Sequence, residues 1–227
     1  MNEYELPLVF FTVLCQWGIG GIIALTLYRL RPNSQMSVGQ LKYLVLGLWL
    51  VEVVGSSLSL LHLGSPFGAY RAVLGLPHSW LSREVIAFIL VNISLFLMLA
   101  VCWLRPQKSA LITTLGMVTS LLGIAAILVS AQIYYQMASH PLWHTPLTQL
   151  AFLSTALLLG FATLGIYLNC CGLAAPRTVR YGLLVGCLLL LATLVGRYQI
   201  AGASAQGIML WWQLVGSMLV GGVLFAV

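Results

Sequence analysis

The chain is 227 residues long, with 61% hydrophobic residues, only 6% charged residues and a formal net charge of +6. Its mean hydropathy is +1.03. A soluble domain carries about 25% charged residues, so this composition excludes a soluble globular fold and predicts an integral membrane protein with several spans. The basic residues stand singly or in pairs beside apolar runs, which is typical of membrane topology and not of a nucleic-acid-binding surface.

Seven apolar runs are long enough to span a bilayer, so we expect an all-α, polytopic bundle that occupies residues 1–227 as one domain. The expected helices are residues 6–30, 43–63, 81–104, 109–137, 147–171, 181–200 and 208–227. No basic segment precedes the first run and no small-residue cleavage site follows it, which indicates a retained helix rather than a signal peptide. Gly18, Gly20 and Gly21 lie in its middle and predict a close approach of two helices.

The distribution of basic residues predicts the orientation of the bundle. The first, third and fifth loops carry seven of them: Arg29, Arg31, Lys42, Arg105, Lys108, Arg177 and Arg180. The positive-inside rule places these loops in the cytoplasm and the N-terminus outside, which is the periplasm in a Gram-negative bacterium.

Polar and titratable residues concentrate in the stretch from Ser56 to Glu84, where the second expected helix ends and the third begins. Such groups are costly near lipid and are therefore functional candidates. We expect Ser82 near the N-cap of the third helix and Glu84 in its first turn, where the helix dipole favours a carboxylate. The orientation above places this stretch on the outer side.

The histidines and cysteines argue against a haem or a metal in this protein. A haem b needs two histidines that face one another within the membrane, and only His62 lies near a helix interior. His78 falls in a loop, and His140 and His144 form an interfacial loop pair separated by a proline. The five cysteines lie in apolar runs without the spacing of a zinc or iron–sulfur site, so we interpret them as buried small hydrophobic residues.

Oxidation of a quinol fits the residues between Ser56 and Glu84 better than binding of a haem or a metal does. It requires an apolar cleft, hydrogen-bond partners for the ring oxygens and a base that is connected to water. A neutral His62 imidazole can accept a proton, and the Glu84 carboxylate can pass it outward. Arg71 or Arg83 could keep Glu84 ionised by charge pairing. The alternative is structural: His62 caps its helix, and Glu84 pairs with Arg83 or with the helix dipole.

Three segments carry a resemblance to a known family. Residues 47–85 read GLWLVEVVGSSLSLLHLGSPFGAYRAVLGLPHSWLSREV, with the features LHLGSP, an aromatic at Tyr70, and LSRE. Residues 7–21 read PLVFFTVLCQWGIGG, and residues 134–160 read YYQMASHPLWHTPLTQLAFLSTALLLG. Together they resemble the DmsC family, the membrane anchor subunit of bacterial dimethyl sulfoxide reductase, over roughly residues 6–170.

The resemblance implies a haem-free anchor in the bacterial inner membrane. Such an anchor would hold a four-cluster iron–sulfur subunit and a molybdopterin catalytic subunit on the periplasmic face. It would oxidise menaquinol and pass the electrons to the nearest cluster. The family's quinol-site residues carry over onto His62 and Glu84. We expect the surrounding pocket at Gly64, Ser65, Pro66, Tyr70, Arg71 and Arg83.

The sequence departs from the family pattern at its C-terminal end. The family usually has eight helices, and only seven are expected here, so the protein is interpreted as a shortened member or a partial product. Gly196–Arg197 does not take over the role of the family's late Gly-Arg, because its position suits the sixth helix better. Two other functions stay open. One is a structural anchor without quinone chemistry, and the other is a small transporter, for which only Glu52 and Arg197 supply polar residues within helices.

Overall fold

A computed structural model describes residues 6–32, 34–62 and 75–201. Its helices are α1 (Leu6–Arg29), α2 (Val38–His62), α4 (Trp80–Leu104), α5 (Ser109–Tyr135), α6 (Leu147–Cys170) and α7 (Arg177–Ala201). The described residues contain no strand, so the predicted all-α class is confirmed. These ranges contain six helices where the sequence predicted seven for the whole protein, and the expected helix at residues 208–227 lies outside them.

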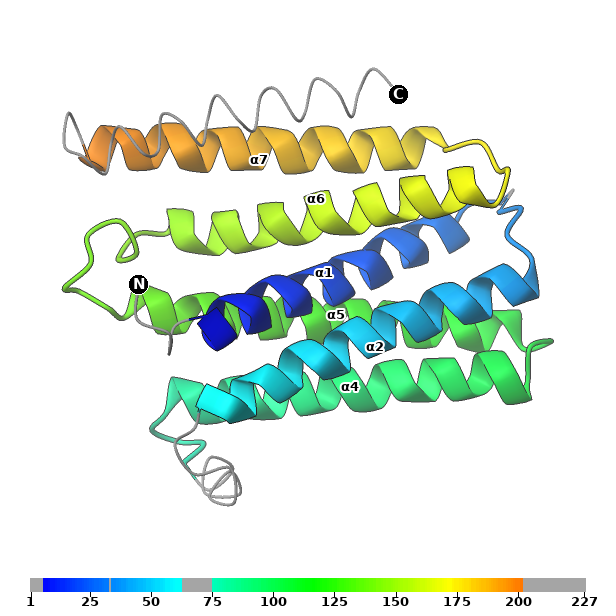
Figure 1. The fold of residues 1–227 in the computed structure, drawn as a ribbon, viewed down its shortest axis with the longest axis horizontal. Helices are drawn as coiled ribbons and strands as arrows, with labels where there is room; N and C mark the ends of the chain where they lie inside the picture. The colour runs from blue at the N-terminus through cyan, green and yellow to red at the C-terminus, as the bar shows by residue number, and fades with distance from the viewer. Residues whose placement is uncertain (1–5, 33, 63–74, 202–227) are drawn as a thin grey trace.

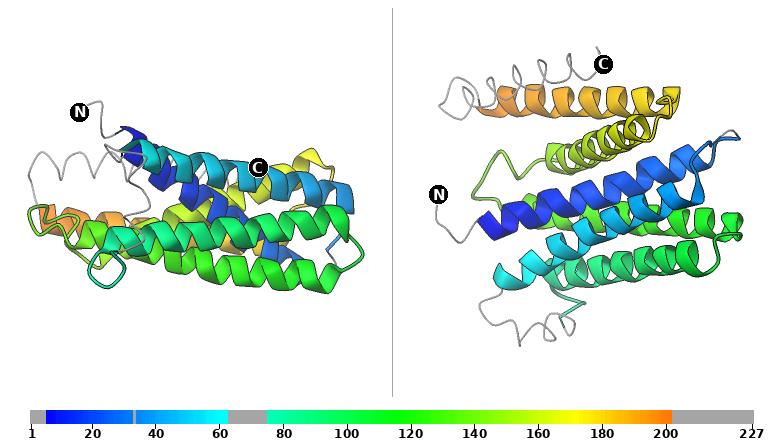
Figure 2. Two further views of the ribbon diagram at one scale, coloured as in Figure 1. Left: turned by 90° about the horizontal axis from the view of Figure 1, so that it is seen from below. Right: turned by 45° about the vertical axis from the view of Figure 1, so that its right-hand side comes forward.

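The helices run side by side, and the chain direction reverses from each described helix to the next (Figure 1). Helix α1 has a central position, because it packs against α2, α5, α6 and α7. Helices α2 and α5 overlap in Figure 1, but the view from below separates them on different sides of the bundle (Figure 2). The end of α2, the start of α4 and the connection between α5 and α6 lie at the same end of the bundle as the start of α1 (Figure 1). This is the end that the positive-inside rule places outside, and we call it the outer end.

All six described helices are long and apolar enough to cross a membrane. A helix of 25 residues, such as α4, spans about 37 Å at 1.5 Å per residue, which exceeds a hydrocarbon core of about 30 Å. Large apolar side chains cover the outside of the bundle, and Leu104 is the most exposed of them at 76%. An outside of this kind suits lipid rather than water, and the molecule is an integral membrane protein.

The glycines of α1 bring helices into close contact, as the sequence predicts. A Cβ atom at Gly20 would lie 1.8 Å from the backbone oxygen of Ala156 in α6, and one at Gly160 would lie 2.0 Å from the Gly20 carbonyl carbon. The other two glycines face α2, where a Cβ at Gly18 or Gly21 would meet a side chain. A methyl group has no space at Gly20 or Gly160, so the two backbones touch directly.

Two helices begin earlier than the sequence indicated. Helix α2 begins at Val38 rather than at residue 43, because Ser37 and Gln40 form a capping box. The Gln40 amide donates to Ser37 Oγ at 3.2 Å, and the Ser37 amide donates to Gln40 Oε1 at 2.8 Å. Helix α7 begins at Arg177 rather than at residue 181, directly after Pro176, a residue type that suits the start of a helix.

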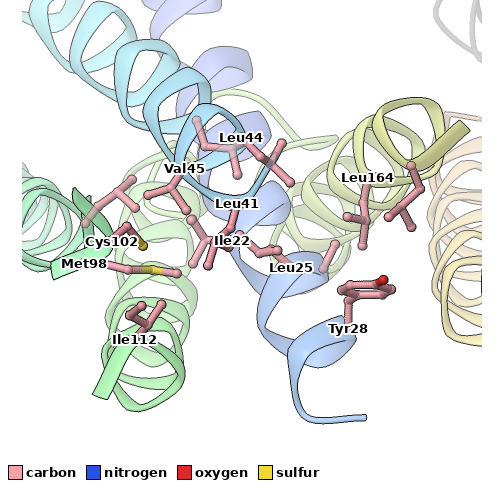
Figure 3. Close-up of a cluster of buried hydrophobic side chains, with 14 of the residues drawn as sticks. Ile22, Leu25, Tyr28, Leu41, Leu44, Val45, Met98, Cys102, Ile112 and Leu164 are labelled. Carbon is pink, nitrogen blue, oxygen red and sulfur yellow. The ribbon is translucent and has the colours of Figure 1, made fainter. Parts of the chain in front are cut away.

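The end of the bundle opposite the outer end is a packed apolar core. Figure 3 shows part of it, with Ile22 and Leu25 of α1 between Val45 of α2, Met98 of α4 and Leu164 of α6. The aromatic ring of Tyr28 belongs to the same cluster, and its hydroxyl accepts a hydrogen bond from the Gln35 amide at 3.1 Å. This half of the bundle therefore supplies stability rather than a polar site.

Candidate functional site

The start of α4 positions Glu84 inside the outer half of the bundle. Ser79 is the N-cap residue, and its hydroxyl accepts a hydrogen bond from the Ser82 amide at 3.4 Å. The N-cap is therefore Ser79, about one turn before the predicted Ser82. Ser82 itself lies inside the helix and is buried. Glu84 is the fifth residue of the helix and not part of its first turn, so the helix dipole contributes less to it than the sequence suggested.

Glu84 is only 5% exposed, and it faces polar groups of the neighbouring helices. The Ser130 hydroxyl of α5 interacts with its carboxyl. The phenol of Tyr134 and the thiol of Cys15 both lie within electrostatic range of the same carboxyl. Glu84 thus occupies a polar site between α1, α4 and α5, at about one and a half turns of depth from the outer end of α4.

Arg83 points away from this site. Its Nε donates to the Leu76 carbonyl oxygen at 3.2 Å, and a terminal nitrogen donates to the Pro77 carbonyl oxygen at 3.1 Å. The guanidinium also stacks 4.4 Å from the centre of the Trp80 ring. Arg83 therefore stabilises the turn before α4. It does not form the ion pair with Glu84 that the sequence suggested.

His62 is the last residue of α2, so its backbone lies at the same end of the bundle as the start of α4 (Figure 1). Its side chain is outside the described part of the structure. The other predicted pocket residues also lie outside the described residues: Gly64, Ser65, Pro66, Tyr70 and Arg71. Of the predicted site, the structure thus places two side chains, those of Glu84 and Arg83, and it separates them.

A polar group that the sequence reasoning missed lies one layer deeper. The side-chain amide of Asn92 donates to the Phe88 carbonyl oxygen at 2.9 Å and to Ser56 Oγ of α2 at 3.0 Å. Ser56 also contacts the Cys15 thiol of α1 at 3.8 Å. The signal in the sequence is an asparagine two turns after Glu84 within an otherwise apolar helix. A polar residue at that spacing falls on the same side of the helix.

Glu52 lies in the middle of α2 and is 0% exposed. Neither carboxyl oxygen has a hydrogen-bond partner. The Cys15 thiol approaches the carboxyl without reaching hydrogen-bond geometry, and Gly18 of α1 leaves the space that the group occupies. An unpaired carboxylate is costly in such a place, and the described residues supply no hydrogen-bond partner for it across the bundle.

Arg197 belongs to a different polar cluster, between α6 and α7. Its terminal nitrogen donates to Thr148 Oγ1 at 3.2 Å, and Gln149 donates to Gln132 of α5 at 3.1 Å. Glu52 packs on α1 instead, so the two polar residues that a transporter would require do not share a site.

The two loop histidines contact aromatic residues. The His144 ring stacks on Tyr135 with 4.9 Å between ring centres, and the His140 ring lies 4.5 Å from the Trp143 ring. These contacts fit the prediction of an interfacial loop between α5 and α6.

Comparison with known proteins identifies the family. The family model described as DMSO reductase anchor subunit (DmsC) matches residues 1–214. This protein belongs to the DmsC family. The match covers the segments from which the resemblance was inferred and continues beyond residue 170.

Several relatives carry names that agree with this assignment. The sequence is 30% identical to the C chain of the anaerobic dimethyl sulfoxide reductase of Haemophilus influenzae, over 69% of its own length and 56% of the relative. It is 31% identical to the protein of the same name from Escherichia coli, over 72% of its length and 58% of the relative. The C subunit of a sulfite dehydrogenase of Allochromatium vinosum is 29% identical to this protein, over 70% of this sequence and 53% of the relative.

The protein thus spans a little more than half the length of these relatives. No solved structure matches it.

Proposed function

We propose that this protein is the membrane anchor and quinol-oxidising subunit of a dimethyl sulfoxide reductase-type molybdoenzyme complex. In this role it holds an iron–sulfur subunit, and through it a molybdopterin subunit, at the periplasmic face of a bacterial inner membrane. Menaquinol gives two electrons to the nearest cluster and two protons to the aqueous phase. Membership of the DmsC family and the names of the relatives support the anchor role.

The observation that carries the quinol chemistry is the position of Glu84. A buried carboxyl close to the outer end, with the hydroxyl of Ser130 and the phenol of Tyr134 beside it, is suited to receive a proton from a ring hydroxyl. Its depth leaves a short path to water through the start of α4. His62 ends α2 at the same end of the bundle, and we assign it as the base that takes the first proton.

The test is quinol-dependent reduction of the iron–sulfur clusters in membranes that contain the assembled complex. We expect Glu84→Gln and His62→Ala to lower the rate at least 100-fold, because general-base catalysis typically contributes about 10² to 10⁴ in rate. Glu52→Gln is the matched control, since it neutralises a carboxyl that lies outside this site. Immunoblots of the membrane fraction report whether the partner subunits remain bound.

Two results would contradict the proposal. If Glu84→Gln and Glu52→Gln reduce the clusters at the wild-type rate, Glu84 has no part in the chemistry. If the wild-type complex reduces no cluster with quinol while the partners stay on the membrane, the protein is a structural anchor only.

A further inference from the structure

The carboxamide of Asn92 includes a buried acceptor without a donor. Its amide nitrogen is committed to the Phe88 carbonyl and to Ser56 Oγ. Because a backbone carbonyl can only accept, this contact fixes which end of the amide is the nitrogen. Neither contact uses the carboxamide oxygen Oδ1, which is buried and has no hydrogen-bond partner. An unsatisfied buried acceptor of this kind lowers stability unless a ligand or a water supplies the donor.

The spacing between Asn92 and Glu84 matches the length of a quinol ring. The two residues are eight positions apart on α4, so they are separated by about 12 Å along the helix axis. Both side chains tilt toward the helix N-terminus, which preserves this separation. A para-quinol with a hydrogen bond at each oxygen spans roughly 11 Å, from ~5.5 Å between the ring oxygens and ~2.7 Å for each O–H···O contact.

The residue between them supplies an apolar wall. Phe88 lies one turn from each polar residue, is buried, and packs edge-on against Phe11 of α1 with 5.2 Å between the ring centres. A quinol ring beside it would find aromatic surface along its length and a polar group at each end. Asn92 Oδ1 is inaccessible in the structure, and the hydrogen bond from Asn92 to Ser56 joins α2 and α4 at this depth, so entry of the ring requires these two helices to separate there.

We infer that Asn92 is a second quinol-binding residue, whose Oδ1 accepts the hydrogen bond of the ring hydroxyl farther from Glu84. This inference rests on the proposed quinol site. Its consequence is selectivity between redox forms. With its amide nitrogen committed, Asn92 offers only an acceptor, which a quinol hydroxyl can satisfy and a quinone carbonyl cannot. The reduced substrate is therefore held more tightly than the oxidised product, and oxidation favours release.

The test measures the dissociation constants of menaquinol and menaquinone separately, by anaerobic quenching of tryptophan fluorescence of the complex in lipid nanodiscs. We expect Asn92→Leu to weaken quinol binding about tenfold, as for the loss of a single neutral hydrogen bond, and to change quinone binding less than about twofold. Ser94→Ala is the matched control, because Ser94 is a buried polar residue of α4 that bonds to Thr119 of α5 at 2.7 Å, away from Ser56.

Ser56→Ala separates a binding role from a structural one. It removes the tie between α2 and α4 but leaves the Phe88 carbonyl to hold the amide, so we expect quinol affinity within about threefold of wild type. If Asn92 serves only to join the helices, Ser56→Ala and Asn92→Leu weaken binding of both redox forms alike, which would overturn the inference. An unchanged ratio of quinol to quinone affinity in Asn92→Leu would overturn it as well, and would indicate a water at Oδ1.

The two proposals fail in different ways. If Glu84→Gln abolishes cluster reduction while Asn92→Leu leaves both affinities unchanged, the quinol site stands and Asn92 lies outside it. If wild type binds neither redox form, both proposals are wrong.

Discussion

Substitution of Gly20 by alanine gives the sharpest test of how α1 and α6 pack. The added Cβ would lie 1.8 Å from the Ala156 backbone oxygen and 2.6 Å from its carbonyl carbon. Both contacts are to backbone, so rotation of a side chain relieves neither of them. To restore an ordinary contact of about 3.3 Å, the two helices have to separate by roughly 1.5 Å at this point.

The magnitude follows from the interactions that this separation disturbs. Overpacking of a well-packed interface costs about 1–3 kcal/mol, and the absence of a flexible neighbour places Gly20→Ala at the upper end. The hydrogen bond from Trp17 Nε1 to Thr163 Oγ1, which joins the same two helices at 2.6 Å, is weakened as well and contributes about 0.6 kcal/mol. We expect a loss of about 3 kcal/mol in the free energy of unfolding.

The assay is reversible unfolding of the purified protein in mixed micelles, followed by circular dichroism. Gly47→Ala is the control, because its Cβ would meet nothing within 4 Å, and we expect it to change the free energy by less than about 0.5 kcal/mol. A Gly20→Ala protein as stable as Gly47→Ala would refute the backbone contact between α1 and α6.

Two further predictions concern Glu52. Replacement by methionine, which is similar in size and has no charge, should stabilise the fold by about 1–3 kcal/mol, because it removes a buried carboxyl whose oxygens have no partner. The same unfolding assay checks this, and a loss of stability would indicate a partner for the carboxyl. A double-mutant cycle tests the contact with Gly18: a Cβ there would lie 2.5 Å from Glu52 Oε2, so Gly18→Ala should cost about 1–2 kcal/mol alone and much less in a Glu52→Ala background. Additive effects would contradict this contact.

The class of the fold and the approximate helices could be predicted because lipid imposes a simple rule. Every spanning segment must be long and apolar, so the runs are visible in the sequence. The sequence prediction places the starts of α2 and α7 too late, because α2 begins at a local polar contact and α7 begins directly after Pro176. The spacing of Ser37 and Gln40 fits a capping box, which places the start of α2 at Val38. Glycine at positions 18, 20 and 21 correctly predicted close packing, but not that Gly20 meets α6 while the other two meet α2.

The candidate site was harder to predict because it depends on contacts between helices distant in sequence. Glu84 lies near one end of the bundle, as the helix boundaries in the sequence indicate, but the direction of Arg83 is decided by the carbonyls of the preceding turn. Asn92 was not selected, because an asparagine in an apolar run is informative only once Ser56 of another helix lies beside it. Periodicity indicates the side of a helix and not its neighbour.

The central position of α1 also has a consequence for biogenesis. Gly20 and Ala156 are 136 positions apart in the sequence, so at ~5–20 residues per second the ribosome needs on the order of 10 s to deliver the surface of α6 that α1 must meet. During that interval the backbone of Gly20 has no permanent neighbour in the bilayer, whereas Gly18 and Gly21 can already pack against α2. Insertion of α1 and its final packing against α6 are therefore separate events, and a nascent polypeptide halted before α6 leaves the backbone of Gly20 uncovered.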